Sequence, residues 1–498
     1  MTQLDQVADA DVYNQQAVEK LARAIAMASG EFALVLAHCN YQKLRQSMVR
    51  WFRRVCPAQV CEITLAAEEQ TLFRAVQVAL QSRDAPPDVV MVFGLEAVAD
   101  LPQLLKATNQ VRDEFRNLCP FPLVLWVTDE VLRHLIRLAP DFQSWATLID
   151  FQLATTQLVD ALRQGEEALF NHVLEVGVGR FLSNTDIFGD RYRQELLSAL
   201  GDLAQRQEFL EPNLQASLEF VRGREAYAVD QLDTALHHYT KSLGYWEHTP
   251  DLKRQACLLY SLGLLWRTRA ERNRARHQAY CEEARSYFER CIATFEQAHQ
   301  PQLTARFINV LGDTLQRLEA WNELDRVAQR AVQLHQQYSN LFRLARAYGF
   351  LSEVAIAREQ WELARNYAKT ALTTLDRGLP DAATPLSDAQ RADMDWERSF
   401  HQGWYLLAQA RSQLALGEVD SAILSLETAR TETKPEYDPE LYIRILNQLR
   451  QVYFQQKNYR IAFDIRQMRR AIEYQFGFRA FLGASRLRPK QPITNPVI

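Results

Sequence analysis

Two charged residues in the N-terminal third of the chain stand where phosphate chemistry would need them. Lys43 comes shortly after the apolar run 32–37, and Glu96 follows the apolar run 88–93. A lysine on the β- and γ-phosphates and an acidic residue at a strand end are two parts of a nucleoside triphosphate site. The third part is a glycine-rich loop whose amides point at the phosphates. Lys43 and Glu96 are therefore candidate nucleotide-binding residues if such a loop precedes the lysine.

That loop is missing. The stretch from His38 to Arg45 reads His-Cys-Asn-Tyr-Gln-Lys-Leu-Arg, with no glycine and no Gly-Lys-Ser/Thr triplet. Residues that carry a Cβ do not easily let the backbone approach a phosphate. Glu96 also has a plainer interpretation, as an N-cap or first-turn acid of the helix that follows. The sequence predicts no catalytic residue and no cofactor, with Lys43 and Glu96 kept as candidates for residual nucleotide binding.

Composition argues against several other kinds of site. The seven cysteines are odd in number and lack CxxC spacing, which argues against a disulfide framework and a zinc site. A net charge of −4 does not suggest a nucleic-acid partner. The sequence contains no run of 18 apolar residues, so it predicts no membrane-spanning helix. The first ten residues carry two aspartates and do not read as a secretory signal. We therefore expect a cytoplasmic protein without a metal, a nucleic-acid partner or a membrane insertion.

The elements that would position Lys43 and Glu96 are apolar runs alternating with helical stretches. Such runs predict a parallel sheet that is buried on both faces. A ligand site in this sheet is expected at the carboxyl ends of its strands. The five runs are 32–37, 60–65, 88–93, 122–127 and 148–153.

A pattern of small and bulky residues repeats over about 217–471. Its spacings of 49, 40, 40, 58 and 40 residues indicate a solenoid of stacked helix pairs with a basic period of about 40. The leading residues are Ala235, Ala284, Leu324, Ala364, Ala422 and Ala462. A small residue precedes several of them by twelve positions and lets paired helices approach closely: Gly223, Gly312, Ser352 and Ala410. The pattern resembles a long-helix version of the tetratricopeptide repeat (TPR).

The first helix of each TPR usually lines the surface that binds partner peptides. Asparagine side chains can pair with a peptide backbone, and arginines can grip a carboxylate through two hydrogen bonds. This chemistry favours a protein partner that presents an acidic segment or a C-terminal carboxylate. The candidate partner-binding residues are Arg224, Asn309, Asp313, Arg346, Glu353, Arg411, Arg444 and Asn447.

The whole arrangement resembles cyanobacterial-type STAND proteins (signal-transduction ATPases with numerous domains), which begin with a P-loop-like domain lacking the Walker A loop and continue into TPRs. The run 89–96 resembles a Walker B strand, and 121–129 resembles the neighbouring strand that carries a polar sensor residue. The stretches 108–116, 120–126, 138–145 and 478–487 belong to the same resemblance. In that family the last stretch looks like a linker to an intact ATPase module, and this chain stops there.

The fold class predicted is α/β plus all-α: an open, parallel, degenerate P-loop-like domain followed by a TPR α-solenoid. The expected parts are a helical lead-in (1–30), the α/β domain (31–170), a helical connector (171–215), a solenoid of about six long repeats (216–473) and a basic C-terminal extension (474–498).

The expected function is that of a non-catalytic scaffold or adaptor that binds a partner segment in the TPR groove, with signalling as the expected context. The α/β domain is expected to anchor the protein, to dimerise and so form a homo-oligomer, or to regulate binding. One alternative is a nucleotide-responsive, STAND-like switch, which the absent glycine loop argues against. Another is an assembly chaperone for a client complex, which nothing in the sequence separates from a scaffold.

Overall fold

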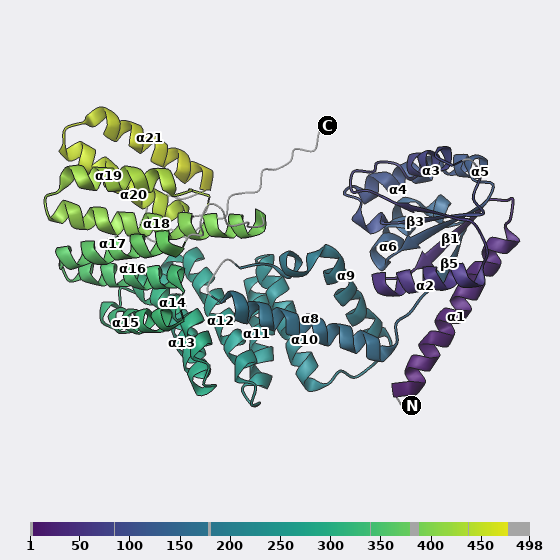
Figure 1. Ribbon diagram of the computed structural model, residues 1–498, viewed down its shortest axis with the longest axis horizontal. Coiled ribbons are helices and arrows are strands. Elements are labelled where there is room, and N and C mark those ends of the chain that lie inside the picture. Colours follow the sequence, from purple (N-terminus) through teal and green to yellow (C-terminus); the bar gives the residue numbers. More distant parts are fainter. Residues whose placement is uncertain are drawn as a thin grey trace. The chain divides into compact units, whose positions relative to one another are not determined.

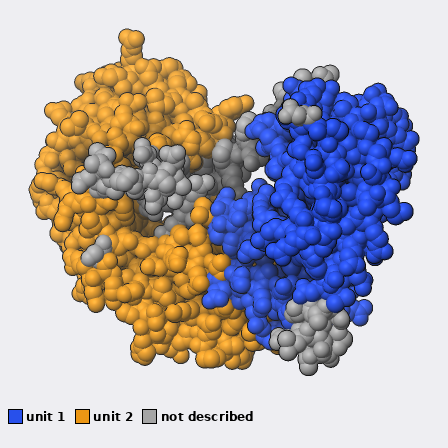
Figure 2. Space-filling model, turned by 45° about the vertical axis from the view of Figure 1, so that its right-hand side comes forward, with its two compact units in different colours: residues 1–167, 184–211 blue, residues 168–183, 212–498 orange. Residues whose placement is uncertain are grey.

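The computed structural model describes residues 3–83, 85–177, 181–338, 340–378, 388–436 and 438–476. The chain divides into two compact units, coloured separately in Figure 2. The first comprises residues 1–167 and 184–211, and the second comprises 168–183 and 212–498. The stretch expected to be one connector, 171–215, is thus shared between the two units. Most of the expected C-terminal extension lies outside the described residues.

The first unit is built on a five-stranded parallel sheet with the strand order β2-β3-β4-β1-β5. Three of its strands, β1, β3 and β5, are labelled in Figure 1. In the central strand β1, Val35 pairs with Val124 of β4 on one side and Thr147 of β5 on the other. The central strands are apolar at nearly every position because helices cover both faces of the sheet. The predicted parallel α/β fold is confirmed. The strands are β1 (Ala33–His38), β2 (Val60–Thr64), β3 (Val89–Phe93), β4 (Pro122–Val127) and β5 (Ala146–Asp150).

Alternate residues of the strands face two separate cores. On one face, Leu36 and Leu125 pack with residues of the helices between β2 and β5, and on the other, Val35 and Trp126 pack with α1 and α2. With both faces covered, the strand ends are the places left for a ligand. The helices are α1 (Gln3–Met27), α2 (Gln42–Val55), α3 (Leu72–Gln81), the 3₁₀ helix η1 (Leu95–Ala97), α4 (Leu101–Gln110), α5 (Arg112–Leu118), α6 (Asp129–Leu138) and α7 (Pro140–Gln143).

The order of the strands singles out the gap between β1 and β4. The connection that leaves β1 through α2 runs to β2 at one edge of the sheet, whereas the connection that leaves β4 passes beyond β1 to β5. Neighbouring strands whose connections leave in opposite directions open a crevice at their carboxyl ends, and ligands of open α/β sheets bind there. One more helix of this unit, α9 (Asn184–Gln205), contributes residues to this edge.

The second unit is a solenoid of six helix pairs within the described residues (Figure 1). It also includes the end of α8 (Thr155–Val176), from residue 168 onward. The predicted TPR-like α-solenoid is confirmed. The pairs are α10 (Pro212–Ala228) with α11 (Leu232–Trp246), α12 (Leu252–Arg272) with α13 (His277–Gln297), α14 (Pro301–Arg317) with α15 (Trp321–Gln337), α16 (Leu341–Ala357) with α17 (Trp361–Gly378), α18 (Asp388–Ala415) with α19 (Val419–Glu432), and α20 (Pro439–Gln455) with α21 (Tyr459–Phe476).

The repeat pattern has a direct packing explanation. All six leading residues lie on the second helix of a pair and are at most 5% exposed. The small residues upstream admit aromatic rings: a Cβ added to Gly223 would lie 2.5 Å from the Tyr239 ring, and one added to Gly263 would lie 2.4 Å from the Phe288 ring. Five of the six pairs also turn through a residue with positive φ, namely Asp230, Glu319, Glu359, Gly417 and Lys457, so the first helix ends in the same left-handed conformation in each.

No described helix is both long enough and apolar enough to cross a membrane.

Candidate functional sites

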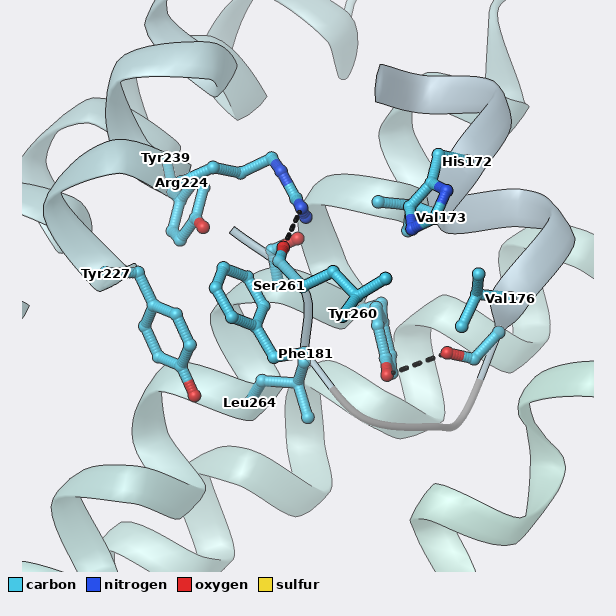
Figure 3. Close-up of a pocket in the computed structure, with 12 residues that line it drawn as sticks. His172, Val173, Val176, Phe181, Arg224, Tyr227, Tyr239, Tyr260, Ser261 and Leu264 are labelled. Atoms are coloured by element: carbon cyan, nitrogen blue, oxygen red, sulfur yellow. Dashed lines mark hydrogen bonds between the residues drawn. The ribbon is translucent and has the colours of Figure 1, made fainter. Parts of the chain in front are cut away.

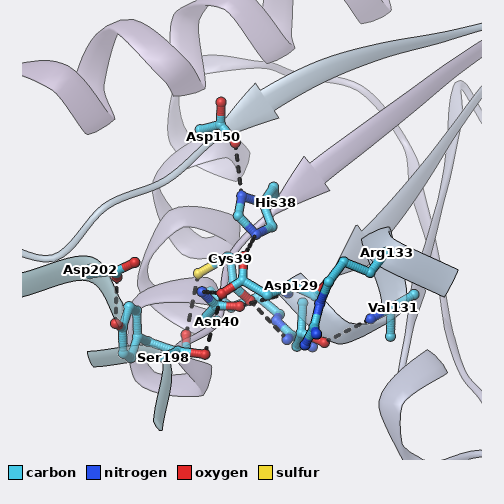
Figure 4. A network of polar contacts seen from close by, with 12 residues as sticks. His38, Cys39, Asn40, Asp129, Val131, Arg133, Asp150, Ser198 and Asp202 are labelled. Carbon is cyan, nitrogen blue, oxygen red and sulfur yellow. Dashed lines mark hydrogen bonds and ion pairs between the residues drawn. The ribbon is translucent and has the colours of Figure 1, made fainter. Parts of the chain in front are cut away.

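The carboxyl ends of β4, β1 and β5 carry a network of polar side chains centred on His38 (Figure 4). His38 is the last residue of β1, and its ring bonds to both neighbours: Nδ1 lies 2.8 Å from Asp150 Oδ1, and Nε2 lies 2.8 Å from Asp129 Oδ1. Asn40 closes the network, because its Nδ2 donates to Asp129 Oδ2 at 2.7 Å and its Oδ1 accepts from the Asp129 amide at 2.8 Å.

Two pKa shifts describe the charge state of this network. Burial alone would lower the pKa of His38, but the hydrogen bonds with Asp129 and Asp150 outweigh it and raise the pKa above its ordinary value. The hydrogen bond with His38 likewise holds the pKa of Asp129 below its usual range. Protonation of His38 therefore strengthens the contacts that join three adjacent strand ends.

Helix α9 adds side chains to the same edge of the sheet. Glu195 accepts a hydrogen bond of 3.0 Å from the backbone amide of Gln42, the first residue of α2, and Arg191 donates to the Gln42 side chain at 2.8 Å. Tyr41 donates to Asp202 at 2.6 Å. The first amides of a helix attract anions, so the Glu195 carboxylate occupies the position that a bound phosphate would use. A cavity of about 360 Å³ remains beside it, lined by both α9 and the strand ends.

The two sequence candidates for nucleotide binding take different places. Lys43 is exposed on α2 and does not line this cavity. Glu96 lies in the first turn of η1 and forms an ion pair of 2.8 Å with Arg45, both side chains being 8% exposed. It does not cap α4, because the N-cap of that helix is Asp100, whose carboxylate accepts from the Gln103 amide. The cations that line the cavity are therefore arginines, namely Arg45, Arg133, Arg191 and Arg193, and not Lys43.

The edge network is poorly arranged for catalysis. Both ring nitrogens of His38 are bonded to carboxylates, so neither is available to take a proton from a substrate. The neighbouring Cys39 is fully buried, and burial raises the pKa of its thiol to about 11, which keeps it out of the thiolate form. In the described part of the chain, no group of three or more His, Cys, Asp or Glu side chains is placed to hold a metal ion.

The second candidate site is the first-helix face of the solenoid, by which we mean the side-chain surface of α10, α12, α14, α16, α18 and α20. Charged residues on this face pair from one first helix to the next. Arg346 Nε donates to Asp313 at 3.0 Å, and Arg411 donates to Glu353 at 3.1 Å. The predicted acidic and basic candidates on these three helices therefore neutralise one another.

The last two candidates in the chain pair more locally. Arg444 donates to Glu440 of its own helix at 2.8 Å, and its guanidinium lies 5.2 Å from the ring centroid of Trp404 on α18. Asn447 accepts from Arg469 of α21 at 2.7 Å. The side chains of Arg411 and Arg444 are both 41% exposed, so a partner can reach them.

Four of the predicted partner-binding residues are buried: Arg346 and Glu353, whose ion pairs are given above, and Asn309 and Arg224, which also hold the solenoid together. Asn309 is 2% exposed; its Nδ2 donates to the Arg343 carbonyl, and its Oδ1 lies 3.1 Å from His335 Nε2. Burial, helped by the charge of Arg343, lowers the pKa of His335 to about 3, so the ring is neutral. Arg224 is 4% exposed and donates to the Leu182 carbonyl at 2.7 Å. Burial removes these four residues from the surface that an incoming partner meets first.

Arg224 is one of several first-helix residues that bind main-chain carbonyls of a single stretch, the crossing segment, defined as residues 168–177 and 181–183 (Figure 3). Tyr260 of α12 donates to the Gly177 carbonyl at 3.1 Å. Arg306 of α14 donates to the Leu174 carbonyl at 2.6 Å, and Arg343 of α16 donates to the Val176 carbonyl at 2.8 Å. Four successive first helices thus hold one stretch of polypeptide.

Aromatic contacts fix the two ends of the crossing segment. Phe170 stacks on Phe220 with ring centroids 4.2 Å apart, and Phe181 meets Tyr227 edge-on at 4.8 Å. Sequence reasoning identified Arg224 but missed Tyr260, Arg306 and Arg343. The repeat pattern marks the buried small residues and gives no sign of which polar side chain on a first helix will reach a carbonyl. The one local signal was Gly177, a glycine at the end of a helical stretch.

The chain is similar to a few known proteins at low sequence identity. No protein-family model matches the chain. An uncharacterized WD repeat-containing protein of Synechocystis is 28% identical over 312 residues, which cover 58% of this chain and 18% of that protein. The chain therefore spans about 18% of the length of that relative.

Among solved structures, the apo form of RapI matches with a TM-score of 0.40 and 10% identity over 64% of this chain and 98% of that chain. A Rap protein complexed with Competence and Sporulation Factor matches with a TM-score of 0.35 and 12% identity, over 64% of this chain and 95% of that chain. A STAND protein with a tetratricopeptide repeat sensor from Pyrococcus horikoshii matches with a TM-score of 0.30 and 11% identity, over 92% of this chain and 82% of that chain. Similarities this distant leave the function to be argued from the chain's own residues.

Proposed function

We propose that this chain is a non-catalytic scaffold or adaptor that binds a polypeptide segment on its first-helix face, in a signalling role of the STAND-like kind. One observation carries the proposal: side chains from α10, α12, α14 and α16 hold the main chain of the crossing segment through four carbonyl groups. A surface that binds main-chain carbonyls in series is suited to polypeptide ligands.

The donors on this face also indicate the chemistry of the partner. Arginines that hydrogen-bond to neutral carbonyl oxygens bind carboxylate oxygens more strongly, because the acceptor then carries a full charge. Arg411 and Arg444 are half exposed and lie beyond the helices that hold the crossing segment. An acidic segment or a chain end with its carboxylate would therefore bind along α18 and α20.

The strand-end network supports the absence of catalysis and of nucleotide chemistry. The anion position at the start of α2 is taken by Glu195, and His38 has no ring nitrogen to spare. A nucleotide at this edge would have to displace a carboxylate that is part of the same folded unit. We therefore favour polypeptide binding over a nucleotide-responsive switch.

The test is selection of peptides from a random library on the purified full chain, followed by affinity measurements on synthetic copies by fluorescence anisotropy. We expect acidic peptides whose affinity falls at least about tenfold in the double variant R411Q/R444Q, equivalent to about 1.4 kcal/mol. The matched control is R290Q/R330Q, which removes two similarly exposed arginines that pair with Glu247 and Glu296 between second helices. Selected peptides that bind both variants equally, or a selection that yields no peptide, would contradict the proposal.

A further inference from the structure

The described end of α8 shows what kind of segment the first half of the first-helix face accepts. We propose that α10, α12, α14 and α16 form a receptor for the C-terminal end of a helix, that the crossing segment is its built-in occupant, and that a helix end of the same kind from a partner competes for it. This inference rests on the proposed function and adds the class of ligand and the need for displacement.

The carbonyls bound here are those that a helix leaves open. The last four carbonyls of an α-helix have no partner within the helix, and they carry the negative end of its dipole. Helix α8 ends at Val176. Arg306 binds the carbonyl of Leu174, Arg343 that of Val176, and Tyr260 that of Gly177 directly after the helix. Two cations and one hydroxyl donor thus complete the end of a helix that would otherwise need water.

Gly177 makes this close approach possible. Its φ is +64°, the left-handed conformation typical of the residue after a helix, and its amide bonds to the Val173 carbonyl. A Cβ on Gly177 would lie 2.3 Å from Cγ of Arg306. The receptor therefore requires both the conformation and the missing side chain of glycine at this position.

An aromatic residue supplies the second requirement. Phe170 lies seven positions before Gly177, which is two helical turns. Its ring stacks on Phe220 of α10, and the guanidinium of Arg254 on α12 lies 5.0 Å from its centroid. The ligand class that follows is a helix with an aromatic residue about two turns before a terminal glycine.

Two features make the occupant exchangeable. The hydrogen bonds described above reach main-chain atoms, so they do not depend on the side chains of the bound helix. A small cavity of about 30 Å³ also remains between the crossing segment and α10 and α12, lined by Val176 and Phe181 on one side and by Tyr227 and Leu264 on the other. This is room for about one water molecule, so the crossing segment does not fill the space beside α10 and α12 completely.

Covalent attachment explains why displacement is needed. A tethered segment has an effective concentration in the millimolar range, so a free ligand must bind more tightly or the tethered one must be weakened.

The experiment weakens the binding of the tethered crossing segment. A fluorescent peptide with the native sequence 163–183 is titrated into the full chain carrying F170A, and into the wild-type chain. We expect at least tenfold tighter binding to F170A than to the wild type, and at least tenfold weaker binding of the peptide that itself carries F170A.

A second variant of the crossing segment and a variant of the receptor itself complete the experiment. G177A in the full chain weakens the other end of the crossing segment and should also expose the receptor, whereas adding R306Q and R343Q to F170A should abolish binding. Far-UV circular dichroism shows whether each variant folds, and if neither F170A nor G177A does, the wild-type chain is titrated with the peptide to about 1 mM. Failure of the peptide to bind any folded form would overturn the inference. The proposed function would survive that failure if library peptides still depended on Arg411 and Arg444.

Discussion

The strand-end network and the first-helix face are both built from charged and polar side chains, and they differ in what those side chains bind. At the strand ends, His38, Asp129 and Asn40 bind one another, and α9 adds further side chains. On the first-helix face, ion pairs such as Arg346 with Asp313 also occur, but Tyr260, Arg306 and Arg343 bind main-chain carbonyls of the crossing segment. Contacts between side chains specify one partner, whereas contacts to main chain accept any segment of suitable shape. This comparison supports our proposal that the strand-end network is structural and that the first-helix face binds polypeptide.

The largest effect should come from breaking the buried ion pair beside the strand-end network. We expect E96Q to lower the free energy of unfolding by about 3–5 kcal/mol, because it leaves the Arg45 charge buried without its partner. The matched control is E62Q, which breaks the more exposed pair with Arg53 and should cost about 0–1 kcal/mol. Urea unfolding measures both, and equal costs for the two variants would mean that Arg45 is solvated in the folded protein.

A smaller effect should separate the packing of the solenoid from helix propensity. In G263A the new methyl meets the Phe288 ring, and overpacking of this kind costs about 1–3 kcal/mol. In G244A, on a second helix with open space around it, the same change should stabilise by about 0.5–1 kcal/mol. Thermal unfolding would show opposite signs for the two variants; a stabilised G263A would show that the first and second helices of that pair are not in close contact.

The two sites should also respond to pH in opposite directions. The pKa of folded His38 is raised, so its contribution to stability is complete below the unfolded pKa of about 6.5 and is lost as pH rises through the folded value. The pKa of folded His335 is lowered to about 3, so its contribution is present above about 6.5 and is lost as pH falls.

We therefore expect the cost of H38Q to grow between pH 8.5 and pH 5.5. The difference in free energy of unfolding between the wild type and H335Q should decrease by about 1.4 kcal/mol when the pH falls from 7.5 to 5.5. Urea unfolding at several pH values measures both variants. Parallel pH profiles for the two variants would contradict the assigned charge states.

The smallest expected effect is that of nucleotides. Because Glu195 occupies the anion position at the start of α2, Mg-ATP and ADP at 1 mM should leave the melting temperature unchanged. A dissociation constant of about 100 μM would instead stabilise the protein by about 1.4 kcal/mol at that concentration. In that event E195Q, which removes the competing charge, should bind more tightly than the wild type.

The sequence was sufficient for the architecture and for part of the candidate sites. Buried strands such as 122–127 and packed positions such as Ala284 and Gly223 follow from apolar runs and from spacing, because burial acts on residue type. The positions of Asp313 and Arg346 on neighbouring first helices also follow from spacing. Their pairing with each other does not, since a repeat period says nothing about which charges meet across a 33-residue separation.

Two features were beyond sequence reasoning for a common reason. Residues 168–183 belong to the solenoid and 184–211 to the α/β unit, yet neither stretch has a composition that distinguishes it from a connector. The hydrogen bond from the Gln42 amide to Glu195 joins residues 153 positions apart in the chain. The hydrogen bond from Arg306 to the Leu174 carbonyl joins residues 132 positions apart. Such contacts depend on how whole elements pack, and no local pattern encodes them.

The most direct measurement of the central claim is amide hydrogen exchange of the full chain, wild type against R306Q/R343Q. If the first-helix face holds the crossing segment through its carbonyls, the amides of residues 168–177 should be strongly protected in the wild type. In the variant they should exchange at least about tenfold faster, corresponding to about 1.4 kcal/mol. The sheet and the second helices α13 and α15 should keep their protection. Unchanged protection of residues 168–177 in the variant would show that α8 is held by its own packing, and the account of the first-helix face as a polypeptide receptor would be wrong.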